Sequence, residues 1–312
     1  MNIVPIVIFT YRRKIDELIK SLLKNKLAKY SNLYIFSDGY KNAIDKKDVL
    51  EVRESLKDIS GFKNITIKES KLNNGLANSV IYGVTEIINQ YTKVIVLEDD
   101  LIVADNFLDY MNEALEFYNK NQKIWSISGY TPNLECLNNY DKDIFLSVRA
   151  SSWGWATWKD RWIRIDWDIK DWDDFKKDKN AIKSFNRAGN DMFKMLEIQM
   201  LGKIDSWAIR WCYNQFRFNA YTIYPTKSKL VNNGFDDKGT HNSDGLKRWE
   251  VVSSNKIVNF EDLKVNNKII DCFAKKYNLQ LKTRIGYLLK QFGSYRITKK
   301  TIKFIGAFKF YR

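Results

Sequence analysis

Three consecutive acids, Glu98, Asp99 and Asp100, come directly after a short apolar run, Val94–Leu97. Such a run is typical of a strand buried on both faces of a mostly parallel sheet. Ligands of open α/β sheets bind outside the carboxyl ends of the strands, where these acids would lie. A divalent cation, held by carboxylates and substrate phosphates, would relieve the repulsion among three like charges. The pattern therefore predicts a metal and phosphate site, with a polar loop whose acids cap the next helix as the alternative.

Other polar side chains are expected at the same edge, because strands predicted over 3–10, 33–37 and 64–69 alternate with helical spacing. This order indicates right-handed βαβ units in a parallel sheet. An Asp after the second strand could accept a hydrogen bond from a base imide, and a basic residue near Arg13 could neutralise a diphosphate. A glycine lets the backbone approach a ligand closely. The residues expected at this edge are Thr10, Tyr11, Arg12, Asp38, Lys71, Asn74 and Gly75.

The first half of the chain resembles a GT-A glycosyltransferase. The resemblance rests on a strand running into Thr-Tyr-Arg, an Asp after the second strand, Asn-x-Gly-Leu-Ala, and the acidic strand end. Glu98-Asp99-Asp100-Leu101 is similar to the Glu-Asp-Asp-Leu segment of the N-acetylglucosaminyltransferase I type and of related bacterial sugar transferases. The resemblance implies a nucleotide-sugar donor, usually UDP-linked, and a Mn2+ or Mg2+ ion. It also implies that Asp100 binds the metal and that Asp99 and Glu98 face the ribose and the transferred sugar.

A second constellation surrounds Asp205 in Lys203–Arg210. An Asp or Ser at a loop-to-helix junction is commonly an N-cap, and Asp205 or Ser206 could serve as one. The resemblance implies a different role, because inverting transferases of this type place an Asp shortly before a Trp as general base. Such a base takes the proton of the acceptor hydroxyl while the metal stabilises the departing diphosphate. Arg210, on the following helix, could orient this Asp or bind phosphate.

Tryptophans and one histidine complete the candidate site. Trp153 and Gly154 lie in a small-residue and Trp-rich segment, and flat indole faces around a glycine suit the apolar face of a pyranose, with a packed core loop as the alternative. His241, the only histidine of the chain, lies in a polar segment with the composition of a lid. The resemblance implies contact of His241 with the diphosphate or the metal, and an exposed histidine without a function is the alternative. Core packing is expected of Trp162, Trp167 and Trp172.

The composition bounds the compartment and the partners. The 312 residues carry a net charge of +15, from 52 Lys and Arg against 37 Asp and Glu, which favours anionic partners. Three widely spaced cysteines form no metal pattern and no disulfide framework, so a reducing compartment is expected. A strand pattern begins within a few residues of the start, which leaves no room for a signal peptide, and no apolar run approaches the length of a membrane span. We therefore expect a cytoplasmic protein.

The composition changes after residue 245. We divide the chain into a GT-A domain over 1–245, with a nucleotide-sugar half (1–130) and an acceptor half (131–245), and a basic, partly amphipathic helical extension over 246–312. Apolar residues alternate with Lys and Arg through 281–312, which predicts a helix on an anionic membrane surface. A helix that covers the domain, or a protein-partner site, is the alternative. No nucleic-acid partner is expected, because no binding motif accompanies the charge.

The sequence thus predicts an α/β protein of GT-A type, with a Rossmann-like, mostly parallel sheet flanked by helices. The expected function is metal-dependent, inverting transfer from a nucleotide sugar to an oligosaccharide or lipid-linked glycan. Assembly of a bacterial surface polysaccharide, such as lipopolysaccharide or capsule, on the inner face of the cytoplasmic membrane would fit. One alternative is a sugar-phosphate nucleotidyltransferase, although Phe9–Arg12 lacks its usual glycine-rich loop. The other is a non-catalytic membrane- or RNA-binding module, which the presence of Asp100 and Asp205 disfavours.

Overall fold

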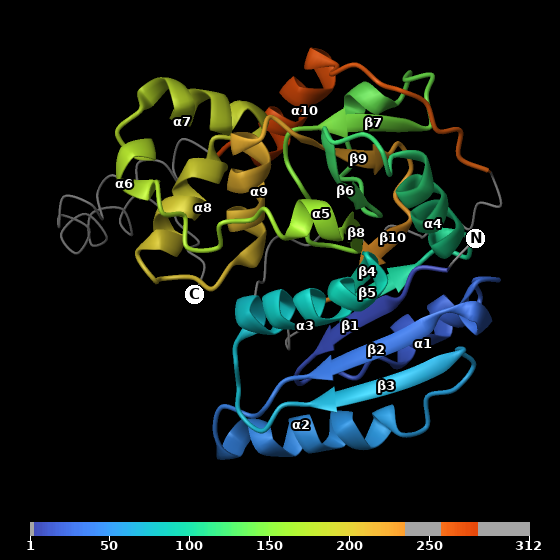
Figure 1. Ribbon diagram of the computed structural model, residues 1–312. Coiled ribbons are helices and arrows are strands. Elements are labelled where there is room, and N and C mark those ends of the chain that lie inside the picture. The colour runs from blue at the N-terminus through green and yellow to red at the C-terminus, as the bar shows by residue number, and fades with distance from the viewer. Residues whose placement is uncertain (1–2, 235–256, 280–312) are drawn as a thin grey trace, which may run out of the picture.

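The computed structural model describes residues 3–234 and 257–279. An eight-stranded mixed sheet runs through the molecule in the order β3-β2-β1-β4-β8-β6-β9-β7, and helices cover both of its faces (Figure 1). The fold is therefore of the predicted α/β type with a mostly parallel sheet. The strands of this sheet are β1 (Ile6–Thr10), β2 (Asn32–Ser37), β3 (Asn64–Glu69), β4 (Lys93–Glu98), β6 (Ile124–Ser128), β7 (Ile144–Ser147), β8 (Trp155–Trp158) and β9 (Tyr221–Pro225).

The first half of the sheet is parallel and places the predicted site at one edge. Thr10 at the end of β1 pairs with Ser37 of β2, Ser37 pairs with Glu69 of β3, and Phe9 pairs with Glu98 of β4. The residues that follow these strands therefore emerge together, as the sequence predicts. The helices α1 and α2 pack on one face of the sheet and α3 packs on the other. Their bounds are α1 (Asp16–Leu23), α2 (Ala43–Leu56) and α3 (Leu76–Tyr91).

The second half extends the same sheet with reversed strands. β8 runs antiparallel between β4 and β6, β9 is parallel to β6, and β7 is antiparallel to β9 at the edge. A separate two-stranded sheet pairs β5 (Leu101–Val103) with β10 (Leu230–Asn232) immediately after the acidic end of β4. The helices of this half are α4 (Phe107–Phe117), α5 (Lys159–Trp162), α6 (Trp172–Phe175), α7 (Lys179–Phe185), α8 (Asp191–Met200), α9 (Trp207–Arg217) and α10 (Asn267–Tyr277).

Most of the Trp-rich segment belongs to the core. All four residues of β8 are buried because the strand lies in the middle of a sheet with packing on both faces. Trp155 packs against Trp162 and Trp207, with ring centroids 5.8 Å and 4.7 Å away, on the α3 side, whereas Trp158 joins the core on the α1 side. Trp162 packs in the core as predicted, and β8 offers no indole face to a sugar.

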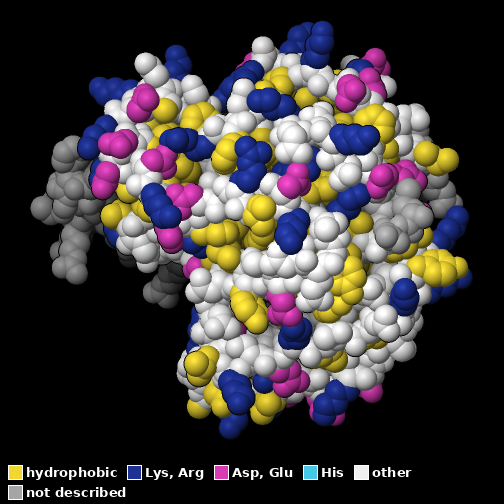
Figure 2. All heavy atoms as spheres, in the orientation of Figure 1, with side chains coloured by type: hydrophobic (Ala, Val, Ile, Leu, Met, Phe, Trp, Pro, Cys, Tyr) yellow, Lys and Arg dark blue, Asp and Glu magenta, His cyan; other side chains and the backbone are white. Residues whose placement is uncertain are grey.

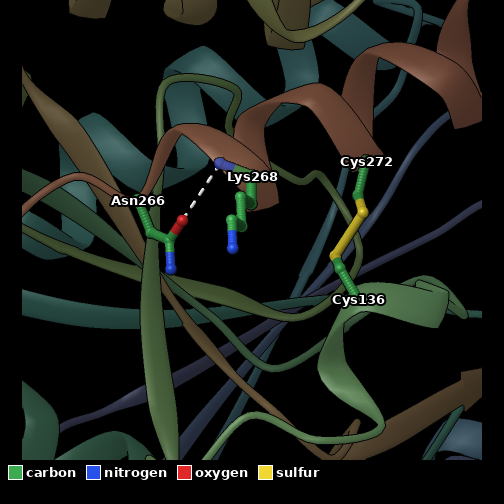
Figure 3. The surroundings of a disulfide bond; sticks show 4 residues. All are labelled: Cys136, Asn266, Lys268 and Cys272. Carbon is green, nitrogen blue, oxygen red and sulfur yellow. Dashed lines mark hydrogen bonds between the residues drawn. A yellow bond between two sulfur atoms is a disulfide. The ribbon is translucent and has the colours of Figure 1, made fainter.

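The prediction that the cysteines form no disulfide is wrong. Cys136 in the 3-10 turn η2 (Glu135–Leu137) and Cys272 in α10 are joined by a disulfide, with their Cα atoms 6.5 Å apart (Figure 3). Cys212 is the free, buried cysteine. The two bonded cysteines are 136 residues apart, so local spacing does not reveal the pair, and packing of α10 on η2 brings them together. The inference of a reducing compartment from the cysteine pattern is therefore withdrawn.

The described part of the predicted extension packs on the domain. α10 buries Ile269, Ile270 and Phe273 in the core that also contains α8 and α9. Phe260 lies against Tyr110 of α4, with ring centroids 5.8 Å apart. Residues 246–256 and 280–312, which include the predicted membrane-binding tail, lie outside the described residues.

The described residues contain no membrane-spanning helix, and the face shown in Figure 2 carries charges of both signs. No helix within 3–234 or 257–279 is long and apolar enough to cross a membrane. Lys and Arg side chains are spread over the face shown in Figure 2, among acidic and apolar side chains. This face therefore presents no continuous basic patch for an anionic surface.

Candidate active site

Residues that follow β1 contact Asp99, the middle one of the three acids at the end of β4. The backbone N–H of Tyr11 donates to Asp99 Oδ2 (3.3 Å), and Arg13 Nε lies 3.9 Å from Asp99 Oδ1. Arg12, which the sequence suggested for the nucleotide, pairs instead with two acids of α2, Asp45 (2.9 Å) and Asp48. The cation beside the acidic strand end is therefore that of Arg13.

The rest of the predicted β1 end is also tied to its surroundings. The Tyr11 hydroxyl donates to Asp45 Oδ2 (2.7 Å), and the Thr10 hydroxyl donates to the carbonyl of Arg13 (2.8 Å). Burial and the acceptor Asp45 raise the pKa of Tyr11 to about 12. Tyr11 is therefore a neutral donor at physiological pH that fixes the turn between β1 and α1.

Burial and mutual repulsion raise the pKa values of Glu98 and Asp99. Glu98 and Asp99 are partly buried. Burial is the largest cause of the raised pKa of Glu98, followed by the charges of Asp100 and Asp99. The pKa of Asp99 rises to about 7, from burial first and then from Asp100, against the lowering effects of the Tyr11 N–H and Arg13. Such a site gains when a cation replaces the protons.

This pKa shift predicts a pH-dependent gain in stability for Asp99→Asn. The carboxyl holds its proton up to a pH of about 7 in the folded protein but only to its ordinary value of 3.8 when unfolded, so the unfolding free energy falls as the pH rises through that interval. Without metal, the variant should be more stable than the parent at pH 8, by on the order of 1–3 kcal/mol, and by less at pH 5. Urea unfolding with a chelator present measures both values. An equal difference at the two pH values would contradict the shift.

A residue that sequence reasoning missed holds Asp100. Asn232, at the end of β10, donates from Nδ2 to Asp100 Oδ2 (3.0 Å), and the N–H of Asn233 donates to the Asp100 carbonyl (2.7 Å). A Cβ atom on Gly234 would lie 2.4 Å from Asp100 Oδ2, so a larger residue there would displace the Asp100 carboxylate. No local signal marks Asn232, because its partner is 132 residues away and only the pairing of β10 with β5 joins them.

The donor set at this end suits a hard divalent cation. Asp99 and Asp100 supply carboxylate oxygens, and Asn232 and Arg13 orient them. Mg2+ and Mn2+ are commonly held by one or two carboxylates, with substrate phosphates and waters completing the shell. Within the described residues no group of three or more His, Cys, Asp or Glu side chains forms a closed metal site. The residues present therefore fit a cation that is shared with a phosphate ligand.

The end of β2 organises a turn. Asp38 is buried, and its Oδ1 accepts from the N–H groups of Gly39 (2.9 Å) and Asn74 (2.9 Å), while its Oδ2 accepts from the N–H of Gly75 (3.1 Å). The Asn74 side chain donates to Ser70 Oγ (2.9 Å). These bonds fix the turn between β3 and α3, so the carboxylate that was expected to read a nucleobase also holds the backbone at the same edge.

Asp205 caps a helix other than its own. Ser206 is the N-cap of α9, whereas Asp205 Oδ2 accepts from the N–H of Ala77 in the first turn of α3 (3.1 Å). Asp205 is exposed. The amino end of a helix stabilises a negative charge, so the first turn of α3 is a favourable place for this carboxylate. The candidate base therefore stands at the sheet edge that bears the acidic end of β4.

Gly75→Ala is predicted to disturb Asp205. Gly75 has φ +78°, and a Cβ atom there would lie 2.8 Å from Asp205 Oδ2. The positive-φ, extended backbone of Gly75 (ψ 163°) alone should make alanine there less stable, by about 1–3 kcal/mol in the free energy of unfolding. Gly202, with φ +67° and nothing within 4 Å of an added Cβ atom, is the matched control. We expect both alanine variants to have a lower unfolding free energy in chemical denaturation. Only Gly75→Ala should also lower the rate at which the nucleotide sugar is cleaved, by about tenfold or more. Equal turnover in the two variants would contradict a role of this contact.

The remaining predicted residues make mostly structural contacts. Gly154 is adjacent to Leu97 and Leu230, where a Cβ atom would lie 2.1 Å from Leu230 Cδ2. Trp153 lies edge-on against Tyr130, with ring centroids 4.5 Å apart.

Arg210 donates to the carbonyls of Ser206 (3.3 Å) and Trp167 (3.1 Å). Burial lowers its pKa, against the raising charge of Asp205. Lys71 is exposed on the turn before α3. His241 lies outside the described residues.

A cavity of about 430 Å³ lies beside the turn that Asp38 holds, with Phe36, Asn74, Asn78 and Tyr82 in its wall. A larger hollow of about 1230 Å³ lies at the opposite edge of the sheet, lined by Val4, Lys63 and Lys93 among others, and contains none of the predicted residues. The position of the smaller cavity, next to predicted nucleotide contacts, makes it the more relevant of the two.

The profile of the GNT-I family matches residues 1–188, which include the parallel half of the sheet and the acidic end of β4. The chain belongs to the GNT-I family. This is a family of glycosyltransferases of GT-A type, so the family that the sequence resembles is confirmed, and with it the glycosyltransferase class. Asp205 lies beyond the matched residues, and its role does not follow from the match.

The remaining comparisons add little. A search of the curated proteins finds no significant match. Among solved structures, a cytidylyltransferase from Leptospira borgpetersenii serovar Hardjo-bovis is similar at 14% identity with a TM-score of 0.32, over 53% of this chain and 64% of that chain. The chain thus spans less than two thirds of that structure, and a similarity this low supports no argument about activity.

Proposed function

We propose that this member of the GNT-I family is a metal-dependent, inverting glycosyltransferase that moves a sugar from a nucleotide sugar, UDP-linked, to a hydroxyl group of a glycan. One observation carries the proposal. Asp205 is exposed and held by the N–H of Ala77 at the sheet edge where the acidic end of β4 also emerges. A base for the acceptor and carboxylates for the donor's cation are the two groups that such a transfer needs.

The donor side of the site consists of Asp100, Asp99 and Glu98. GNT-I-type transferases generally depend on a divalent metal. Asp100, oriented by Asn232, would hold the ion, which when bound supplies positive charge to the leaving diphosphate. Asp99 and Glu98 would face the ribose and the transferred sugar, and Arg13 adds a fixed positive charge beside them. Thr10, Tyr11, Lys71, Asn74 and Gly75, which lie at or after the strand ends, complete the proposed donor side.

The acceptor side of the site depends on Asp205. The carboxylate of Asp205 takes the proton of the acceptor hydroxyl. As the proton leaves, the oxygen of that hydroxyl attacks the anomeric carbon from the face opposite the diphosphate. The bond from the anomeric carbon to the phosphate oxygen breaks, and the diphosphate leaves with the electron pair, so the configuration inverts. The N–H of Ala77 holds one oxygen of this carboxylate and thereby orients the base before the acceptor arrives. Trp153, in the loop before β8, is proposed to line the sugar.

For the acceptor we propose an oligosaccharide or lipid-linked glycan of a surface polysaccharide, such as a lipopolysaccharide or capsule unit. The net charge of +15 supports an anionic, phosphate-bearing acceptor.

Thermal unfolding with a panel of nucleoside diphosphates and UDP-sugars, with and without Mn2+, tests the donor site. A ligand that binds only the folded protein raises its apparent stability by mass action. We expect uridine compounds with Mn2+ to raise the melting temperature by about 5 °C at a concentration 100 times the Kd. No shift with any nucleotide, with or without metal, would contradict the proposal.

A further inference from the structure

One turn of the backbone, between β3 and α3, is held by two carboxylates from distant parts of the chain. On one side, Asp38 accepts the N–H groups of Asn74 (2.9 Å) and Gly75 (3.1 Å). On the other side, the N–H of Ala77, two residues later, donates to Asp205 Oδ2 (3.1 Å). The nucleotide end of the predicted site and the candidate base are therefore joined through a short run of consecutive residues.

This turn has little freedom to absorb a displacement. Gly39 packs directly on it, since a Cβ atom there would lie 2.4 Å from the carbonyl carbon of Leu72, and the side chain of Asn73 donates to the Gly39 carbonyl (2.7 Å). Gly75 begins α3 with its carbonyl accepting from the N–H of Ser79 (3.1 Å). A shift of Asn74 or Gly75 therefore moves the first turn of α3, and with it the donor that orients Asp205.

We propose that Asp38 is a positioning residue for the general base, acting through this turn on the N–H of Ala77 and so on Asp205. The inference rests on the proposed function, in which Asp205 is the base. A carboxylate has about four acceptor sites. Three N–H groups, those of Gly39, Asn74 and Gly75, already donate to Asp38, so most of its hydrogen-bonding capacity serves the turn. The sequence predicts that Asp38, which follows the second strand, accepts a hydrogen bond from a nucleobase. That bond would compete with the three backbone N–H groups for the acceptor sites of the carboxylate.

The structural half of the proposal is tested by the amide signal of Ala77 in protein labelled with 15N-alanine. Asp205→Ala should shift this signal and speed its hydrogen exchange by about tenfold or more, because the carboxylate acceptor is gone. Asp38→Asn should also shift the Ala77 amide signal and speed its exchange, although Asp38 does not contact Ala77. Asp38→Glu replaces this variant if it does not fold. Glu54→Gln is the control, since Glu54 is an exposed acid of α2 that pairs with Lys57. An Ala77 amide that is unchanged by substitution of Asp38 overturns the proposal.

The functional half is tested by hydrolysis of the UDP-sugar that the protein turns over, with water as the acceptor, and by UDP binding with Mn2+. Asp38→Asn should lower kcat by about 10- to 100-fold while the Kd for UDP changes by less than about threefold. In the Asp205→Asn background the same substitution should have almost no further effect. A tenfold loss of UDP affinity with unchanged kcat, or independent effects in the double variant, overturns it. If the parent protein binds no UDP, the proposed function fails, whereas the Ala77 amide still tests the linkage.

Discussion

Replacing Asp205 with asparagine is expected to lower the rate of sugar transfer by about 10²- to 10⁴-fold, the usual contribution of a general base. Asparagine keeps the size of the side chain and an oxygen that can accept from the N–H of Ala77. It cannot take a proton from the acceptor hydroxyl. Release of nucleoside diphosphate from the nucleotide sugar measures the rate, and the affinity for UDP with Mn2+ should be retained.

Asp173→Asn is a suitable control for this substitution. Asp173 is an exposed acid of α6 that pairs with Lys176, and its side chain is 78% exposed. The control should transfer sugar at the parent's rate. A near-parental rate in Asp205→Asn as well would show that Asp205 only caps α3.

The second large effect is expected from Asp100→Ala. Loss of a group next to a metal ligand typically weakens metal affinity by about 10- to 100-fold, so loss of the ligand itself should weaken Mn2+-dependent UDP binding by about 100-fold or more. Asn232→Ala should give the smaller loss, about 10- to 100-fold, because Asn232 only orients Asp100 through its 3.0 Å hydrogen bond. Titration calorimetry with Mn2+ and UDP measures both variants.

This graded pair of effects distinguishes a metal site from a polar loop. If Asp100→Ala binds UDP with Mn2+ as tightly as the parent, Asp100 is not a metal ligand. If Asn232→Ala weakens binding while Asp100→Ala does not, the site is formed by β10 rather than by the acidic end of β4.

The parallel half of the fold could be predicted from sequence because each of its signals is local. The apolar run of Val94–Leu97 becomes β4, the segment 64–69 becomes β3 as predicted, and the polar residues after each strand lie at one edge. Parallel pairing aligns the carboxyl ends of the strands regardless of which side chains follow. The residues after these strands therefore lie at one edge of the sheet.

The contacts within the site could not be predicted, because their partners are far apart in the chain. Asp205 and Ala77 are separated by 128 residues, and Asn232 and Asp100 by 132 residues. Nothing in the local sequence of either partner specifies the other. The resemblance supplied a role for Asp205, but the helix that holds its carboxylate, α3 rather than α9, is visible only in the folded chain.

Three sequence-based interpretations were wrong or only partly right, each for a physical reason. The cysteine pair Cys136–Cys272 depends on the packing of α10 against η2. The Trp-rich segment looked like a sugar platform, yet its strand lies between β4 and β6 and therefore buries Trp155 and Trp158. Arg12 and Arg13 are adjacent in sequence, and only the structure shows that Arg13 is the one beside Asp99.

The most direct test of the proposed activity is the product formed from a nucleotide sugar. The protein would be incubated with Mg2+ and each of several UDP-sugars, with water as the acceptor, and in a second reaction with UTP and a sugar 1-phosphate, followed by 31P NMR. We predict that UDP forms in the first reaction with the parent protein and not with Asp205→Asn, and that the second reaction gives no pyrophosphate. Pyrophosphate in the second reaction, with every UDP-sugar left intact in the first, would show a nucleotidyltransferase and contradict the proposed function.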